Sequence, residues 1–131
     1  MRQELKILKK FIRDVQDSED RIQHDIVTWF HNSYCLYKHK PRGLIMSVPN
    51  GGRRDKKEAM KLKATGLLAG AADLILIYNG KLLFMEVKTD IGKQSDAQVE
   101  FEHRITDNGL KYYIVRSLEQ AQELVKRELI G

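Results

Sequence analysis

The strongest local signal in the sequence is a hairpin. Two runs rich in Leu, Ile, Val and Phe, Leu74–Tyr78 and Lys81–Val87, are joined by Asn79-Gly80, the dipeptide that favours a two-residue type I′ turn. Such a turn pairs Tyr78 with Lys81. It therefore sets the register of the whole ladder, because a slip of one residue would move every side chain to the other face.

This register brings two acidic residues face to face. Asp73, at the entrance of the first strand, lies opposite Glu86, and Lys88 follows on the same face as Glu86. Facing like charges destabilise a sheet, and an unpaired buried charge is costly. A divalent cation would resolve the repulsion, since two carboxylates with a main-chain carbonyl and waters suit Mg²⁺ or Mn²⁺. The alternative is a surface Glu-Lys-Asp cluster at a sheet edge, which would contribute little.

Length and composition bound the remaining possibilities. The 131 residues suffice for about one domain with a well-buried core, and no linker or repeat marks a boundary, so we expect one domain over residues 1–131. A net charge of +5 and a pI near 9.3 favour a polyanionic partner without identifying it. The single cysteine, Cys35, excludes an internal disulfide and a Cys-based zinc site. It favours a reducing, cytoplasmic location, and no apolar run approaches the roughly 20 residues of a membrane span.

The other segments predict a mixed α/β domain in which a central mixed sheet is flanked by helices. The expected elements are a helix over 2–16, a second helix capped by Ser18, a strand within 43–49 followed by a turn at 50–52, a helix opened by a Ser95–Gln98 capping box and closed by Gly109, a strand over 112–116, and a last helix capped by Ser117. The basic segment 53–63 is compatible with either a short helix or a surface loop. The helix between the hairpin and residue 112 is expected to be a crossover.

The motifs resemble a known family. Asp73, followed by Glu86-Val87-Lys88 at the end of the next strand, matches the PD-(D/E)XK nuclease core, and the fuller pattern is similar to a stand-alone VRR-NUC domain of the phage or bacterial type. The other matching positions are Glu19 with Gln23, Asn50-Gly51, the segment 66–73, Thr89, Gly92, Ser95 with Gln98, and Gly109, so the resemblance covers about residues 18–125. It departs at Ala72, where the family usually has proline, which affects the stiffness of the turn more than the chemistry.

The resemblance implies a restriction-endonuclease-like fold and a set of site residues. The metal ligands would be Asp73, Glu86, Val87 and Glu19. Lys88 would serve the attacking water, and Gln98 and Gln23 would support the site. For Gln98 the capping box is an equally good explanation, and the helix dipole favours an acid at Glu19 in any case. The four histidines show no metal-ligand spacing, and we expect them to be surface or helix residues.

Two groups of cations are candidates for DNA contacts. They would bind phosphates with salt-dependent affinity that is independent of sequence, whereas the alternative is a merely solvated charged face. The groups are Lys38, His39, Lys40 and Arg42, and the run Arg53, Arg54, Lys56, Lys57, Lys61 and Lys63.

We therefore predict a Mg²⁺- or Mn²⁺-dependent DNA endonuclease. The resemblance implies branched DNA as the substrate, as for a Holliday-junction resolvase. The alternatives are a flap or single-strand nuclease subunit of a repair or replication complex, and a non-catalytic DNA-binding module with the same fold. Because one acid-acid-lysine cluster makes one cut and resolution needs two, we also predict a homodimer. Apolar surface on the first helix and around Trp29, Tyr34, Leu36 and Tyr37 would form the interface, unless it covers the chain's own core.

Overall fold

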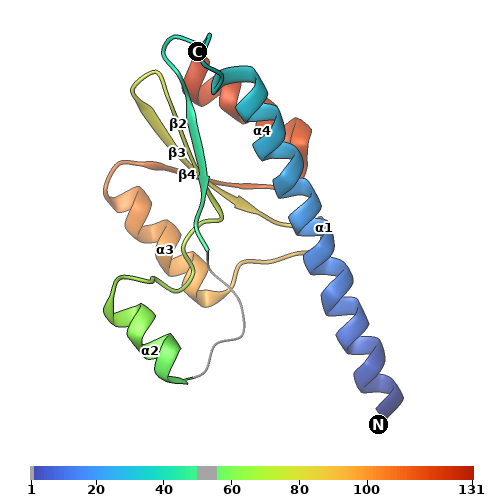
Figure 1. Cartoon of the computed structure of the whole chain (residues 1–131). Coiled ribbons are helices and arrows are strands. Elements are labelled where there is room, and N and C mark those ends of the chain that lie inside the picture. Colours follow the sequence, from blue (N-terminus) through green and yellow to red (C-terminus); the bar gives the residue numbers. More distant parts are fainter. Residues whose placement is uncertain (1, 50–55) are drawn as a thin grey trace.

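The computed structural model describes residues 2–49 and 56–131. Its elements are α1 (Arg2–Tyr34), β1 (Leu44–Ser47), α2 (Lys56–Ala64), β2 (Leu74–Tyr78), β3 (Lys81–Val87), α3 (Asp96–Asp107), β4 (Lys111–Val115) and α4 (Leu118–Val125), which continues as a π-helical turn over Lys126–Ile130 (Figure 1). The four strands form one mixed sheet flanked by helices, so the predicted α/β fold class is confirmed. None of the helices in the described ranges is long and apolar enough to cross a membrane.

The sheet has the strand order β1-β2-β3-β4. The first two pairings are antiparallel and β3 pairs with β4 in parallel, which requires the crossover through α3. At the β2–β3 turn, Asn79 and Gly80 both have positive φ, 54° and 75°, as a type I′ turn demands. Tyr78 pairs with Lys81, and the predicted hairpin is confirmed in both bounds and register.

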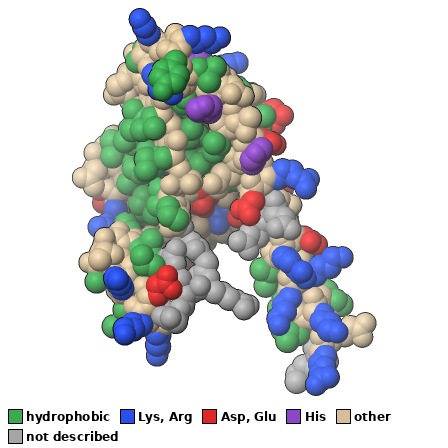
Figure 2. Space-filling view, viewed as in Figure 1, with side chains coloured by type: hydrophobic (Ala, Val, Ile, Leu, Met, Phe, Trp, Pro, Cys, Tyr) green, Lys and Arg blue, Asp and Glu red, His purple; other side chains and the backbone are tan. Residues whose placement is uncertain are grey.

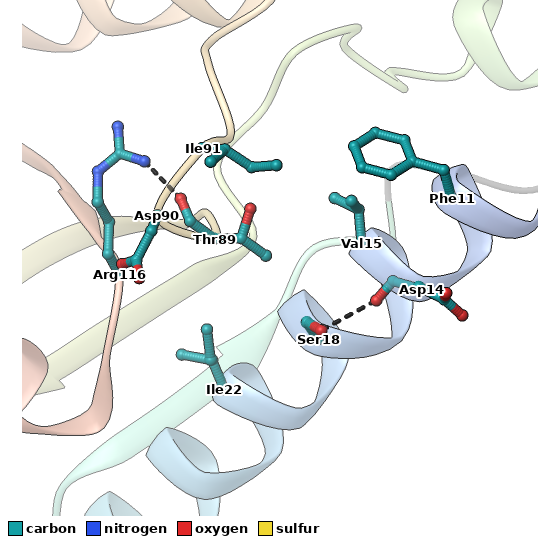
Figure 3. A pocket seen from close by; sticks show the side chains of 9 residues that line it. All are labelled: Phe11, Asp14, Val15, Ser18, Ile22, Thr89, Asp90, Ile91 and Arg116. Carbon is teal, nitrogen blue, oxygen red and sulfur yellow. Dashed lines mark hydrogen bonds between the residues drawn. The ribbon is translucent and has the colours of Figure 1, made fainter. Parts of the chain in front are cut away.

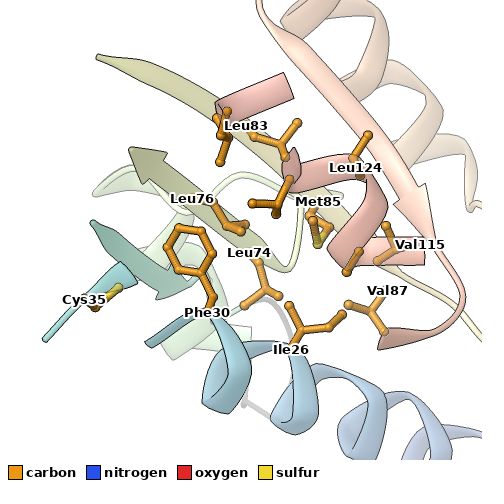
Figure 4. Close-up of a cluster of buried hydrophobic side chains, with 13 residues drawn as sticks. Ile26, Phe30, Cys35, Leu74, Leu76, Leu83, Met85, Val87, Val115 and Leu124 are labelled. Carbon is orange, nitrogen blue, oxygen red and sulfur yellow. The ribbon is translucent and has the colours of Figure 1, made fainter. Parts of the chain in front are cut away.

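The sheet is covered on both faces. Strand residues that alternate along β2 and β3 pack with α1 and α4 on one face, where Ile26 and Phe30 of α1 are fully buried (Figure 4). On the other face Phe101 of α3 packs against Phe84 and Tyr112, with ring centroids 5.8 and 6.0 Å apart. Leu83, Met85 and Val87 of β3 therefore face α1 and α4, whereas Phe84 and Glu86 face α3.

The N-terminal part of the chain differs from prediction. One continuous helix, α1, replaces the two helices expected over 2–16 and after Ser18. The Ser18 hydroxyl does not cap a helix but donates to the carbonyl of Asp14, four residues earlier, at 2.9 Å. Neither Gly nor Pro occurs within α1, so nothing in the sequence interrupts its backbone hydrogen bonds, and a capping residue alone does not break a helix.

The remaining elements lie close to their predicted bounds. The Ser95 capping box opens α3, and Gly109 follows its C-cap with φ of 77°. β4 begins and ends one residue earlier than expected. The basic segment forms a helix, α2, from residue 56, and has no buried residue. The predicted turn at 50–52 and the predicted DNA contacts Arg53 and Arg54 lie outside the described residues.

Candidate active site

Asp73 and Glu86 lie where β2 begins and β3 ends. The pairing of Leu74 with Met85 places Asp73 opposite Glu86 in the predicted register. Two main-chain groups hold Asp73: the amide of Val48 donates to its carbonyl at 2.9 Å, and the amide of Val87 donates to its Oδ2 at 2.8 Å. The acid is therefore anchored to both neighbouring strands.

Glu86 is an unusual acid because its side chain is only 2% exposed. Its Oε2 accepts a hydrogen bond from Gln98 Nε2 at 3.1 Å, while its Oε1 is buried and has no donor among the described residues. Burial, followed by the hydrogen bond and the charge of Asp73, raises the pKa of Glu86 to about 9, although Lys88 lowers it. Burial beside a second acid therefore favours the protonated form of Glu86 when no cation is present.

Gln98 both completes the capping box of α3 and contacts the site residue Glu86, the two roles considered for it from the sequence. Its Oε1 accepts from the amide of Ser95 at 2.8 Å, which completes the capping box, and its Nε2 reaches Glu86. Gly70 allows this approach. At φ of 80°, a Cβ on Gly70 would lie 2.3 Å from the backbone of Ala97 and 2.7 Å from the amide nitrogen of Gln98. The start of α3 can therefore sit against the segment that leads to Asp73.

Glu19 reaches the site from the other layer of the fold. It lies on α1, and its carboxylate accepts a bond from the amide of Thr89. Burial raises the pKa of Glu19, Lys88 lowers it, and Asp73 raises it further. Lys88 lines the same pocket as both glutamates, and its positive charge lowers the pKa of each.

One pocket of about 450 Å³ collects the predicted site side chains. Its lining includes Glu19, Gln23, Asp73, Glu86, Lys88 and Gln98. The Val87 side chain is buried in the core instead, so only its main chain could serve the site. Ser47, Val48, Pro49 and Asp20 also line the pocket; no sequence motif singles out these four positions.

The donor set fits a hard divalent cation. Among the residues that the structure describes, no group of three His, Cys, Asp or Glu side chains is arranged to hold a metal by itself, whereas Asp73, Glu86 and Glu19 line one pocket. Mg²⁺ is commonly held by one or two carboxylates plus waters and substrate phosphates. The donorless Oε1 of Glu86 beside the Asp73 carboxylate matches that requirement.

The predicted cations lie in different places. Lys56, Lys57, Lys61 and Lys63 are all exposed on α2. The 38–42 segment precedes the end of β1 that pairs near the 79–80 turn, about one strand length from the site. There Arg42 donates to the carbonyl of Cys35 at 2.6 Å and stacks 4.0 Å from the Tyr37 ring centroid, so it has a local structural role.

Comparison with known proteins gives a consistent result. No protein-family model matches the sequence, and the search of curated proteins finds no match. A solved structure described as a VRR_NUC domain protein is similar over 86% of this chain and 88% of its own, with a TM-score of 0.67 and 22% identity. A second, described as a VRR_NUC domain, is similar over 83% and 95%, with a TM-score of 0.56 and 23% identity.

The chain has the VRR_NUC fold. The resemblance first indicated by Asp73 and by Glu86 with Lys88 is thereby confirmed at the level of the fold. In this VRR_NUC fold the acid pair lies at the end of the hairpin, on the face covered by α3.

Proposed function

We propose that this VRR_NUC-fold protein is a metal-dependent endonuclease that hydrolyses DNA phosphodiester bonds. The observation that carries the proposal is the facing pair of Asp73 and Glu86, with a buried and donorless Oε1, beside the Lys88 ammonium. Asn and Gln would fill the same space without the cost of placing two acidic side chains together. A site that keeps both acids despite this cost is well suited to a ligand that is itself a cation.

The residues divide the chemistry between them. Asp73 and Glu86, with the Val87 carbonyl and waters, would hold Mg²⁺ or Mn²⁺. Such an ion polarises a phosphoryl oxygen and lowers the pKa of bound water. Lys88 would orient the attacking water or stabilise the charge that develops on the phosphate, and Gln98 keeps Glu86 in place through its Nε2.

Glu19 and Gln23 would line the approach of the substrate. Both belong to α1 and face the pocket. The raised pKa of Glu19 makes this carboxylate a proton acceptor of greater strength than an ordinary glutamate. We propose that Glu19 reaches the same metal cluster, directly or through water, because it lines one pocket with the acid pair.

DNA is the proposed partner because cations gather on both sides of the site. Figure 2 shows Lys and Arg side chains clustered on α2 and on the projecting end of α1. The α2 cations, Lys56, Lys57, Lys61 and Lys63, are exposed on a helix with no buried residue. They would bind phosphates regardless of sequence.

Branched DNA and a homodimer form the finer part of the proposal. We define the N-terminal arm as residues 2–15 of α1, which runs beyond the end of the sheet in Figure 1. Leu5, Leu8 and Ile12 continue the helical row that buries Ile26 and Phe30, yet they are 51%, 53% and 56% exposed; Ile7 and Phe11, outside this row, are 65% and 53% exposed. A second copy would cover this row and supply the second cut of a junction resolvase.

Two of the aromatic residues predicted at the interface pack within the chain itself. Trp29 and Tyr34 pack on the chain's own core, with ring centroids 5.7 Å apart, whereas Tyr37 is 88% exposed beside Arg42. The arm, rather than Trp29 and Tyr34, therefore carries the proposed interface.

A cleavage panel tests the activity. Duplex, flap, single-stranded and four-way junction DNA are incubated with the protein and Mg²⁺ or Mn²⁺, with Asp73→Asn as the inactive control. We expect junction cleavage that requires the metal. Flap or single-strand cleavage would favour a repair-nuclease subunit, and DNA binding without metal binding or cleavage would favour a non-catalytic module.

Sedimentation velocity at micromolar concentration tests the homodimer. The double variant Leu8→Gln, Phe11→Gln should be monomeric and should nick a junction without resolving it. Lys10→Gln, on the opposite side of the arm, should remain dimeric. A wild-type protein that stays monomeric on DNA would refute both the dimer and the resolvase proposal.

A further inference from the structure

Arg116 directly follows β4 and binds the loop that follows β3. Its Nη1 donates to the carbonyl of Thr89 at 2.5 Å (Figure 3). It also donates to the carbonyl of Gly92 at 2.9 Å. The same two strand ends are joined by the amide of Lys88, which donates to the carbonyl of Val115 at 3.0 Å. One side chain thus fixes two points of the loop formed by residues 88–92.

The start of α4 holds Arg116 itself. The main-chain amide of Arg116 donates to Oε1 of Gln120 at 2.7 Å, and the Ser117 hydroxyl caps the first turn of α4. Among the side chains that the structure describes, no carboxylate forms an ion pair with the Arg116 guanidinium. Its donors are therefore used on main-chain carbonyls rather than on a compensating acid.

The 88–92 loop is the part of the fold that connects Lys88 to Glu19. The loop amide at Thr89 donates to the Glu19 carboxylate. A Cβ placed on Gly92 would lie 3.3 Å from Lys88 Cδ and 3.4 Å from Glu19 Oε1. The loop therefore packs directly against both side chains.

We infer that Arg116 is a positioning residue for the nuclease site. By binding the Thr89 and Gly92 carbonyls, it holds the loop in the conformation that places the Lys88 ammonium and the Glu19 carboxylate at the acid pair. This inference rests on the proposed function for its catalytic consequence. We call these two hydrogen bonds from Arg116 to the loop the clamp, and their effect on the loop can be measured without any cleavage assay.

The variants Arg116→Met and Arg116→Lys test this role. Methionine keeps most of the stem and removes the donors, whereas a lysine ammonium can still donate to carbonyls. We expect Arg116→Met to lower kcat on the preferred DNA by about 10- to 100-fold, as for residues that orient metal-site ligands, with DNA affinity almost unchanged. Arg116→Lys should recover most of that loss. Arg127→Met, an exposed arginine on the π-helical turn, is the matched control and should retain wild-type kcat.

Hydrogen exchange supplies the independent measurement. In the metal-free protein, the amides of residues 88–92 should exchange faster in Arg116→Met than in wild type, and Arg116→Lys should restore part of the protection. Unchanged exchange and unchanged kcat would overturn the inference. A loss of DNA affinity at constant kcat would do the same, since Arg116 would then be a phosphate contact. If the wild type cleaves no DNA, the proposed function fails while the exchange result still decides the clamp.

Gly92→Ala probes the same loop if Arg116→Met does not fold. The added methyl would press on the movable ends of Lys88, Thr89 and Glu19 at 3.3 to 3.4 Å, and Gly92 has no positive φ to strain. We expect a folded protein with a severalfold lower kcat and unchanged DNA affinity. Wild-type turnover in Gly92→Ala would contradict a role for this loop in placing Lys88 and Glu19.

Discussion

Replacing Glu86 by Gln is expected to stabilise the metal-free protein while abolishing cleavage. Glutamine preserves the shape of the side chain, can still accept the hydrogen bond from Gln98, and carries no charge beside Asp73. The cost of the wild-type acid follows from its pKa, which is about 9 in the folded chain against an ordinary value of 4.5. At pH 7 folding must therefore protonate Glu86. Over the roughly 2.5 pH units above 4.5, at about 1.4 kcal/mol each, this costs about 3.5 kcal/mol.

The stability that Glu86→Gln gains over the wild type should increase with pH. Between pH 4.5 and 9, Glu86 is protonated in the folded state and ionised in the unfolded state, because folding raises its pKa. Wild-type stability from this group is therefore greatest below pH 4.5 and declines as pH rises through that window, whereas Glu86→Gln lacks the decline. The difference between the two proteins should be below about 1 kcal/mol at pH 5 and several times larger at pH 8.

Urea unfolding in EDTA at pH 5, 7 and 8 measures both quantities. Glu100→Gln, an exposed position on α3, is the control and should follow the wild type at each pH. Addition of Mg²⁺ or Mn²⁺ should stabilise the wild type and leave Glu86→Gln almost unchanged, because only the former retains both acids. The reasoning would be refuted if Glu86→Gln were less stable than the wild type, or if its gain in stability did not increase with pH. Either result would show that burying the Glu86 carboxyl carries no cost from its charge.

The remaining predictions concern turnover, affinity and folding. Lys88→Ala should lower kcat far more than DNA affinity in a binding assay run beside single-turnover cleavage; equal losses would make Lys88 another phosphate contact. Replacing Lys56, Lys57, Lys61 and Lys63 together by Gln should weaken DNA binding and flatten its dependence on salt, measured by fluorescence anisotropy, with kcat at saturating DNA retained; an unchanged salt slope would leave α2 merely solvated. Gly70→Ala should destabilise the protein by more than about 1 kcal/mol in thermal unfolding, because its Cβ would meet main-chain atoms that cannot move aside; wild-type stability would contradict the close approach to α3.

Local features of the chain could be predicted from the sequence because neighbouring residues decide them. Asn79-Gly80 specifies a two-residue turn, and the period of two in the flanking strands then sets Asp73 against Glu86. The Ser95 capping box likewise depends on residues three apart. Ser18 shows the limit of such signals. It has a capping residue's chemistry, yet the helix continues through it, because no Gly or Pro interrupts the backbone hydrogen bonds of α1 and a capping preference alone does not end a helix.

Only the tertiary structure decided which distant residues meet at the site. Glu19 comes from a different layer, and the clamp between Arg116 and the 88–92 loop joins the ends of two strands separated by α3. A lone arginine after a strand carries no sequence signal, because its partners are main-chain carbonyls that every residue possesses. Burial is equally non-local. The sequence by itself set two acids opposite each other, but only packing against α3 made Glu86 almost inaccessible to water and raised its pKa far above that of an ordinary glutamate.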